Sequence, residues 1–150
     1  MGTIEVSADR TVQAPADVVY GYVADLKDHR PNYLASAISE YAVDAGGIGA
    51  GTVVRFRLTA GRRSRIYEMH VAEPEPGRVL TESDARSSLV TTFTVIPFDA
   101  VSRVRIATTW EGAGGMGGVF ERLFAPKVLR RVYLEELDRL DAYARQQSAP

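Results

Sequence analysis

The chain has 150 residues, of which 45% are hydrophobic and 25% charged, with a net charge of −1 and no cysteine. These values fit one globular domain, residues 1–150, and exclude collagen-like and disordered architectures. Without cysteine, disulfides, thiolate metal sites and cysteine nucleophiles are excluded. The chain has only two histidines, so we expect no metal site, and we expect no cofactor. The near-neutral charge argues against nucleic-acid binding.

The expected location follows from the absence of long apolar stretches. No run of 18 apolar residues is present, so we expect no transmembrane segment. The first residues have neither the basic region nor the apolar region of a secretory signal. The sequence therefore predicts a cytoplasmic protein.

Alternation of apolar and polar residues predicts antiparallel strands buried on one face. The pattern occurs seven times, at residues 3–12, 39–44, 54–58, 67–71, 79–84, 89–96 and 103–111. The connections at 61–64 and 97–100 have the length of hairpin loops. Segment 73–77 holds two prolines, which lack an amide donor, so we expect the strand before it to end there.

Helical periodicity or proline placement predicts three helical segments. The first begins at Pro15, which suits a first helical position, and carries the apolar stripe Val18, Val19, Tyr22, Val23 and Leu26. A short segment interrupted by Pro31 follows. The third is a long helix over about 116–146, which Pro126 should kink. Its expected apolar stripe is Leu129, Tyr133, Leu137, Leu140 and Ala144, and its expected solvent side is Arg130, Arg131, Glu135, Asp138 and Asp141.

This order of elements predicts the fold class. A strand, two short helices, six strands and a long helix give an α+β fold with one antiparallel sheet. The long helix is the only element large enough to cover the apolar face of that sheet. A curved seven-stranded sheet cannot contact one helix everywhere, so we expect a cavity between them. The Pro31 segment and the glycine-rich turn at 46–51 should roof it.

Four motifs carry a family resemblance: VQAPADVVY at 12–20 followed by AD at 24–25, PNY at 31–33, EPEPGR at 73–78 and LEELDRL at 134–140. Over about residues 3–145 the chain resembles the SRPBCC superfamily of START / Bet v 1-like helix-grip domains, most of all its bacterial polyketide cyclase/dehydrase branch. The resemblance implies a curved seven-stranded sheet around a long C-terminal helix. Family members often have tryptophan where this chain has Tyr33. These motifs are structural, so they indicate fold more than chemistry.

The inward-facing positions of the predicted strands, with the roof and the long helix, supply a candidate ligand-binding cavity. Its expected residues are Tyr33, Phe56, Tyr67, Met69, Thr91, Phe93, Ile106, Thr108, Trp110, Phe120, Leu123 and Phe124. Among these, Trp110, Phe120 and Phe124 are the preferred ligand-facing aromatics. Tyr67, Thr91 and Thr108 are the polar groups expected to orient a ligand. The alternative is that these side chains are ordinary core.

A second candidate surface consists of Arg55, Arg57, Arg62, Arg63 and Arg65 in one predicted hairpin. These arginines are either a solvated face or a docking surface for an anionic head group or an acyl-carrier domain. Residues 112–117 have the spacing G-x-G-x-x-G, but no second strand follows, so we interpret them as a hinge at the cavity mouth or as a plain loop.

The histidines give no sign of catalysis. We expect His29 in a loop and His70 on the outer face of the sheet, and no catalytic triad or metal motif emerges. Catalytic residues therefore stay unassigned, and the sequence leaves open whether the protein is an enzyme.

The sequence predicts binding of a hydrophobic or amphipathic small molecule, such as a lipid or polyketide, between the sheet and the C-terminal helix. A first alternative is a polyketide cyclase/aromatase that acts largely by positioning its substrate. A second is a START-like lipid- or quinone-binding partner protein that docks through the arginines. A homodimer is compatible with each of these roles.

Overall fold

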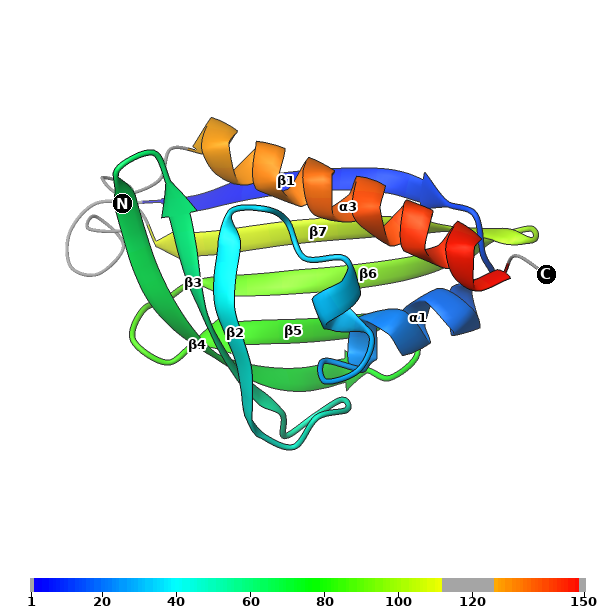
Figure 1. Ribbon diagram of the computed structural model, residues 1–150, viewed down its shortest axis with the longest axis horizontal. Helices are drawn as coiled ribbons and strands as arrows, with labels where there is room; N and C mark the ends of the chain where they lie inside the picture. The colour runs from blue at the N-terminus through cyan, green and yellow to red at the C-terminus, as the bar shows by residue number, and fades with distance from the viewer. Residues whose placement is uncertain (1, 112–125, 149–150) are drawn as a thin grey trace.

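One seven-stranded antiparallel sheet forms the body of the protein in the computed structural model, which describes residues 2–111 and 126–148 (Figure 1). The strands are β1 (Thr3–Val12), β2 (Ile38–Ala45), β3 (Val53–Ala60), β4 (Arg63–Glu75), β5 (Val79–Asp84), β6 (Val90–Phe98) and β7 (Val101–Glu111). Their order across the sheet is β1-β7-β6-β5-β4-β3-β2, so β1 and β2 are the edges. This confirms the predicted α+β class and the order of elements.

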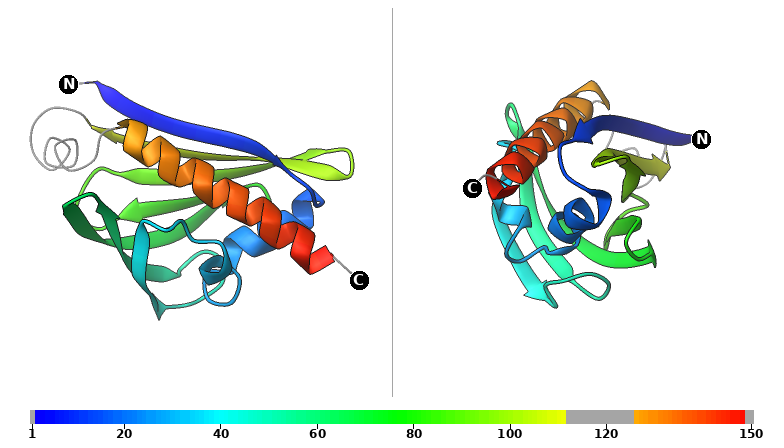
Figure 2. Two further views of the ribbon diagram at one scale, coloured as in Figure 1. Left: turned by 45° about the horizontal axis from the view of Figure 1, so that its top comes forward. Right: turned by 90° about the vertical axis from the view of Figure 1, so that its right-hand side faces the viewer.

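Three helical elements accompany the sheet: α1 (Ala16–Ala24), the 3-10 turn η1 (Arg30–Asn32) and the long α3 (Pro126–Ser148). The end-on view in Figure 2 shows the sheet curving around the helices, with α3 lying across the opening. α3 packs chiefly against β1, whereas α1 packs against β6 and β7. None of the described helices combines the length and the apolar character needed to cross a membrane.

Most strands follow the predicted alternation, but β2 has no buried residue and β4 runs past its expected end. β1 and β5 have the predicted bounds, and the inward residues of β7 are buried at every second position as expected. β4, however, continues through Pro74 to Glu75, although we expected it to end before the prolines. A register shift between Ala72 and Glu75 accounts for the difference, because an irregularity lets the strand accommodate a residue without an amide donor.

The first helix differs from prediction at its start and on its buried face. Pro15 is the N-cap, with extended backbone angles, so the helix begins one residue later than expected. The buried face consists of Val19, Tyr20, Val23 and Ala24, whereas Val18 is 39% exposed. α1 packs against β6 and β7, and the Tyr20 hydroxyl also donates to Glu73 of β4, so the buried face is shifted from the expected stripe toward Tyr20 and Ala24.

The glycine-rich turn between β2 and β3 packs against the end of α1 instead of roofing the cavity. The backbone amide of Leu26 donates to the carbonyl oxygen of Gly47 at 2.8 Å, and the amide of Gly49 donates to the carbonyl oxygen of Ala24 at 2.9 Å. Gly49 has φ +67°, and a Cβ there would collide with the carboxylate of Glu73. The positive φ is the reason that glycine is favoured at position 49, and the nearby Glu73 carboxylate adds to the cost of any side chain there.

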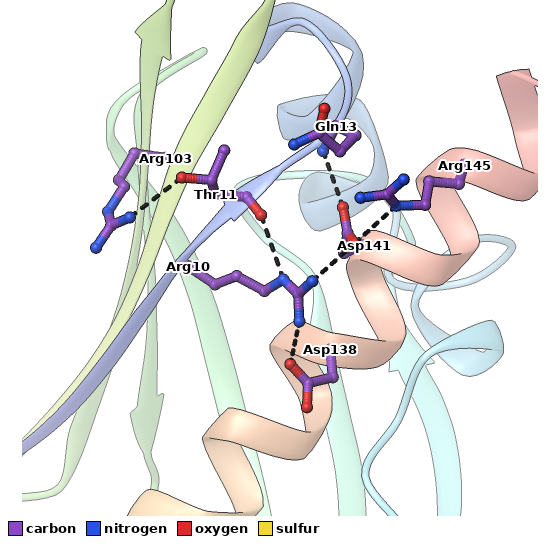
Figure 3. A network of polar contacts seen from close by, with 7 residues as sticks. All are labelled: Arg10, Thr11, Gln13, Arg103, Asp138, Asp141 and Arg145. Atoms are coloured by element: carbon purple, nitrogen blue, oxygen red, sulfur yellow. Dashed lines mark hydrogen bonds and ion pairs between the residues drawn. The ribbon is translucent and has the colours of Figure 1, made fainter.

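A buried carboxylate joins α3 to the N-terminal strand (Figure 3). Asp141 accepts hydrogen bonds from the backbone amide of Gln13 at 2.9 Å, from Arg10 Nη2 at 3.0 Å and from Arg145 Nε at 2.9 Å. Arg10 also pairs with the exposed Asp138. Asp141 was expected on the solvent side of α3, and this expectation was wrong, because these donors make a buried carboxylate favourable there. Burial raises the pKa of Asp141, but the three donors outweigh it and hold the pKa below its ordinary value.

We expect Asp141→Asn to lower the free energy of unfolding by about 1.5–3 kcal/mol at pH 7, because hydrogen bonds to a charged group are lost. The pKa of Asp141 is lowered in the folded state. The contribution of Asp141 to the free energy of unfolding is therefore present above the ordinary carboxyl pKa and is lost as the pH falls below that value. Urea denaturation at pH 7 and pH 3 measures both effects. The control is Asp138→Asn on the exposed side of α3, for which we expect a change below about 1 kcal/mol. Equal effects of the two substitutions would contradict the role of Asp141.

Candidate ligand-binding cavity

A cavity of about 60 Å³ lies between α3 and the concave face of the sheet. Its lining is mostly apolar and comes from residues 30–34, here called the η1 segment, from five strands, from the loop before β6 and from α3. The lining residues are Arg30, Leu34, Ile38, Tyr41, Phe56, Leu58, Tyr67, Met69, Glu82, Leu89, Thr91, Phe93, Leu129, Val132, Tyr133 and Glu136. The η1 segment thus contributes to the wall as predicted, and the glycine-rich turn does not.

The width of the sheet explains why a space remains. Seven strands spaced at about 4.8 Å span about 29 Å from edge to edge, whereas one helix with its side chains is about 10 Å wide. α3 lies along the β1 edge, so the β2–β5 half of the concave face is left to the η1 segment and the cavity. Leu34, Ile38, Tyr41 and Phe56 are only half-buried, which places the opening of the cavity on this side.

The structure places the sequence-predicted cavity residues in three groups. Phe56, Tyr67, Met69, Thr91 and Phe93 lie on the cavity wall. Tyr33, Ile106, Thr108 and Trp110 are buried in the core beside the cavity and do not line it. Phe120, Leu123 and Phe124, together with the glycine motif at 112–117, lie outside the described residues. Trp110 was expected to face a ligand, but in this structure its ring belongs to the packed core.

Three hydroxyl groups form a polar cluster at the wall. Thr91 and Thr108 face each other across β6 and β7, with their Oγ1 atoms 2.7 Å apart. The hydroxyl of Tyr133 on α3 makes a hydrogen bond with Thr108 Oγ1. Burial raises the pKa of Tyr133 to about 12, so its hydroxyl stays protonated near neutral pH. Thr108 therefore acts behind the wall, where it orients Tyr133 and Thr91.

A buried ion pair lies next to the hydroxyl cluster. Arg30 and Glu82 are each 4% exposed, and Arg30 Nη2 lies 2.8 Å from Glu82 Oε2. Arg30 also donates to the carbonyl of Val23 and to the hydroxyl of Tyr33, both at 3.2 Å, and its Cζ lies 4.6 Å from the ring centre of Phe93. Burial lowers the pKa of Arg30, but the Glu82 carboxylate and its neighbours outweigh this and hold the pKa well above its ordinary value.

Glu136 adds a second buried carboxyl group to the cavity. It is 5% exposed and lies on the inward face of α3, three residues after Tyr133. Burial raises its pKa to about 7; the charge of Glu82 acts in the same direction, and Arg30 and the backbone of Ala35 act against it. Glu136 therefore takes up or releases a proton close to neutral pH, which is the property of a general acid or base.

Sequence reasoning missed Arg30, Glu82 and Glu136 because charged residues are normally expected on the outside. Two signals point to the carboxylates. Glu82 lies between Leu80 and Asp84 on the buried phase of β5, and Glu136 falls on the apolar stripe of α3 between Tyr133 and Leu140. No periodic signal marks Arg30, because the three-residue turn that holds it is too short for one.

The five arginines do not form the single surface that the sequence suggested. Arg55 and Arg57 lie on the outer face, where β2 supplies their partners, Asp44 and Glu40. Arg62 and Arg63 are exposed at the β3–β4 turn. Arg65 is on the opposite, inward phase of β4, where it pairs with Asp84 at 2.6 Å and its Cζ lies 4.3 Å from the ring centre of Tyr67. Because side chains alternate between the two faces of a sheet, Arg65 of β4 and Arg57 of β3 lie on opposite faces.

The histidines lie away from the cavity wall. His70 is exposed on the outer face with Glu68, 2.8 Å away, as expected. His29 directly precedes η1, and its Nδ1 lies 2.6 Å from the hydroxyl of Tyr143 on α3. This contact fastens the η1 segment to the C-terminal part of α3. Within the described residues, no group of three or more potential ligand side chains is arranged to hold a metal ion.

The sheet, the long helix and the cavity between them match a known family. A family model described as polyketide cyclase / dehydrase and lipid transport matches residues 3–145. The chain belongs to this polyketide cyclase / dehydrase and lipid transport family. Among curated proteins no sequence matches significantly.

Three solved structures resemble this chain over nearly its whole length. The solution structure of KanY (ms6282) is 37% identical, with 97% of this chain and 99% of that chain covered and a TM-score of 0.85. The Zhui aromatase/cyclase from Streptomyces sp. R1128 is 17% identical, with 99% and 97% covered and a TM-score of 0.76. A START superfamily protein from Mycobacterium smegmatis is 15% identical, with 98% and 100% covered and a TM-score of 0.73.

These likenesses confirm the resemblance to START-like helix-grip domains. The two structures below 20% identity show the shared fold alone. Family and fold are consistent with either hydrophobic-ligand binding or polyketide cyclisation. The choice between these functions therefore depends on the side chains of the cavity.

Proposed function

We propose that this protein binds a hydrophobic or amphipathic small molecule in the cavity between the sheet and α3. The observation that carries the proposal is an apolar wall, partly open to solvent, against which a few polar groups are gathered. Five of the aromatic or aliphatic positions that a ligand would contact are Phe56, Met69, Phe93, Leu129 and Val132.

A ligand of lipid or polyketide size requires the cavity to widen, because its volume of about 60 Å³ is well below the roughly 300–1,000 Å³ of sites for drug-sized molecules. The β2 side is where the wall can move. β2 is an edge strand with two register shifts against β3, and α3 packs against β1 instead of this region. Because β2 makes few contacts with α3, an outward movement of β2 widens the cavity, whereas the η1 segment stays fastened to α3 by the hydrogen bonds of His29 with Tyr143 and of Arg139 with the Leu34 carbonyl.

Native mass spectrometry of the purified protein tests the proposal. We expect a retained small molecule, or saturable uptake of a fluorescent hydrophobic probe, that Val132→Phe abolishes because the larger ring fills the cavity. The matched control is Val18→Phe, which makes the same change at an exposed position of α1 and should leave binding unchanged. A wild-type protein that neither retains a molecule nor takes up the probe contradicts the proposal.

A second candidate function is a polyketide cyclase/aromatase. Glu136 favours it, because a carboxyl group that titrates near neutral pH lies on an apolar wall with the hydroxyl of Tyr133. Such a group can move a proton between a substrate carbon and a carbonyl oxygen while the wall folds the chain. Mass spectrometry of products from a poly-β-ketone substrate tests this role. An unchanged product pattern with wild-type protein removes the cyclase candidate.

A role as a lipid- or quinone-binding partner protein, docking on an acyl-carrier domain or another protein, stays a prediction. It has less support, because Arg55 and Arg57 are already paired with acids of β2. The exposed Arg62 and Arg63 at the β3–β4 turn are what remains of the proposed docking surface. The homodimer and the cytoplasmic location likewise stay predictions.

A further inference from the structure

The buried charges of the cavity do not balance. Arg30 supplies one positive charge, whereas Glu82 and Glu136 supply two carboxyl groups, and all three line the same cavity. Arg30 is committed to Glu82, to the Val23 carbonyl and to the Tyr33 hydroxyl. One carboxyl group therefore has no cation of its own among the described residues that line the cavity.

Among the described residues, the groups that act on Glu136 include no second cation. The charged and titratable groups that act on it are Arg30 and Tyr33 from the η1 segment, Tyr41 from β2, Glu82 from β5, and Tyr133 and Glu135 from α3. Burial raises the pKa values of Tyr33, Tyr41 and Tyr133, so these hydroxyls stay neutral. A buried carboxylate without its own cation is unfavourable, so without a ligand Glu136 keeps its proton unless the pH is high enough to remove it.

We infer that the ligand of this cavity carries a protonated amine at its buried end and that Glu136 is the counter-ion of this amine. The inference rests on the proposed function. A cationic group completes the charge balance of Arg30, Glu82 and Glu136. A carboxylate, in contrast, would place a second negative charge beside Glu82 and leave Glu136 protonated, so fatty acids are the disfavoured class of amphiphile.

Binding of the amine is linked to release of a proton. The amine enters as an ammonium ion, the Glu136 carboxyl group loses its proton to solvent, and an ammonium–carboxylate pair forms. Because the proton leaves, the affinity for an amine should rise with pH until Glu136 is ionised in the free protein. The affinity for a neutral alcohol of the same chain length should not rise with pH.

The test uses octylamine, 1-octanol and octanoate, titrated into the wild-type protein at pH 6 and pH 8 and followed by NMR chemical shifts. We expect octylamine to bind roughly tenfold more tightly at pH 8 than at pH 6, and more tightly than octanol at pH 8. Octanoate should bind most weakly. Glu136→Gln should lose both the pH dependence and the preference for the amine while still binding octanol. Glu75→Gln, the same change at an exposed position of β4, should behave as wild type.

The outcomes separate this inference from the proposed function. Octanol binding with no preference for octylamine, or an amine preference that survives in Glu136→Gln, overturns the inference and leaves the ligand-binding function standing. Failure of all three compounds to bind wild-type protein contradicts the proposed function and the inference together. Preference for octanoate overturns the charge argument directly.

Discussion

Replacing Arg30 by methionine should lower the free energy of unfolding by about 3–5 kcal/mol, because it leaves the buried Glu82 without its cation. The methionine side chain keeps much of the apolar volume of arginine, so the lost stability results from the missing charge and not from an empty cavity. Wild-type Arg30 also holds the η1 segment against α1 through the Val23 carbonyl, which adds to the expected loss.

Urea denaturation at pH 7 measures the effect, and a double variant separates charge from packing. Arg30→Met combined with Glu82→Gln should recover a large part of the loss, since the uncompensated carboxylate of Glu82 is removed. The matched control is Arg55→Met, which breaks an exposed pair with Asp44 and should cost less than about 1 kcal/mol. A double variant no more stable than Arg30→Met alone would show that the buried charge is not the cause.

Glu136→Gln should stabilise the protein above neutral pH. Its folded-state pKa is raised to about 7 from the ordinary 4.5, so the folded protein binds the proton more tightly than the unfolded chain does. The contribution of Glu136 to stability is therefore fully present below pH 4.5 and is lost as the pH rises through 7. The wild-type protein should lose about 3 kcal/mol relative to Glu136→Gln between pH 4.5 and pH 8.

Denaturation curves of both proteins at pH 4.5, 6 and 8 measure this difference. Comparison with the variant cancels the titration of the other carboxyl groups, which the two proteins share. Glu75→Gln again serves as the control. Because the side chain of Glu75 is exposed, the difference in the free energy of unfolding between this variant and wild type should be the same at each pH. If the difference between Glu136→Gln and wild type also stayed the same at each pH, Glu136 would titrate as an ordinary exposed glutamate.

The sheet could be predicted from the sequence because the alternation of apolar and polar residues in a strand indicates which of its side chains are buried. In residues 103–111 every second side chain is apolar or a threonine, and the same side chains are buried in β7. The position of the cavity also followed, since one long helix cannot cover a wide curved sheet, but its volume of about 60 Å³ is set by the side chains that fill the rest. Arg65 could have been assigned to the inner face from its phase with Tyr67 and Met69.

The polar part of the cavity could not be predicted in this way. Whether a charged side chain is buried depends on partners that are distant in sequence, such as Glu82 for Arg30. Asp141 likewise becomes favourable inside only because Gln13 and Arg10 from the other end of the chain supply donors. Local pattern reasoning assigns such residues to solvent, and errors of this kind concentrate where polar groups serve a site.

The most direct test of the account is the position of a bound amphiphile. Isotope-filtered NOE spectra of methyl-labelled protein with saturating 1-octanol report which side chains lie within about 5 Å of its protons. The account predicts contacts with the methyl groups of Leu34, Leu89, Leu129 and Val132, all on the cavity wall. Contacts confined to exposed apolar side chains such as Ile48 or Ile96 would contradict it.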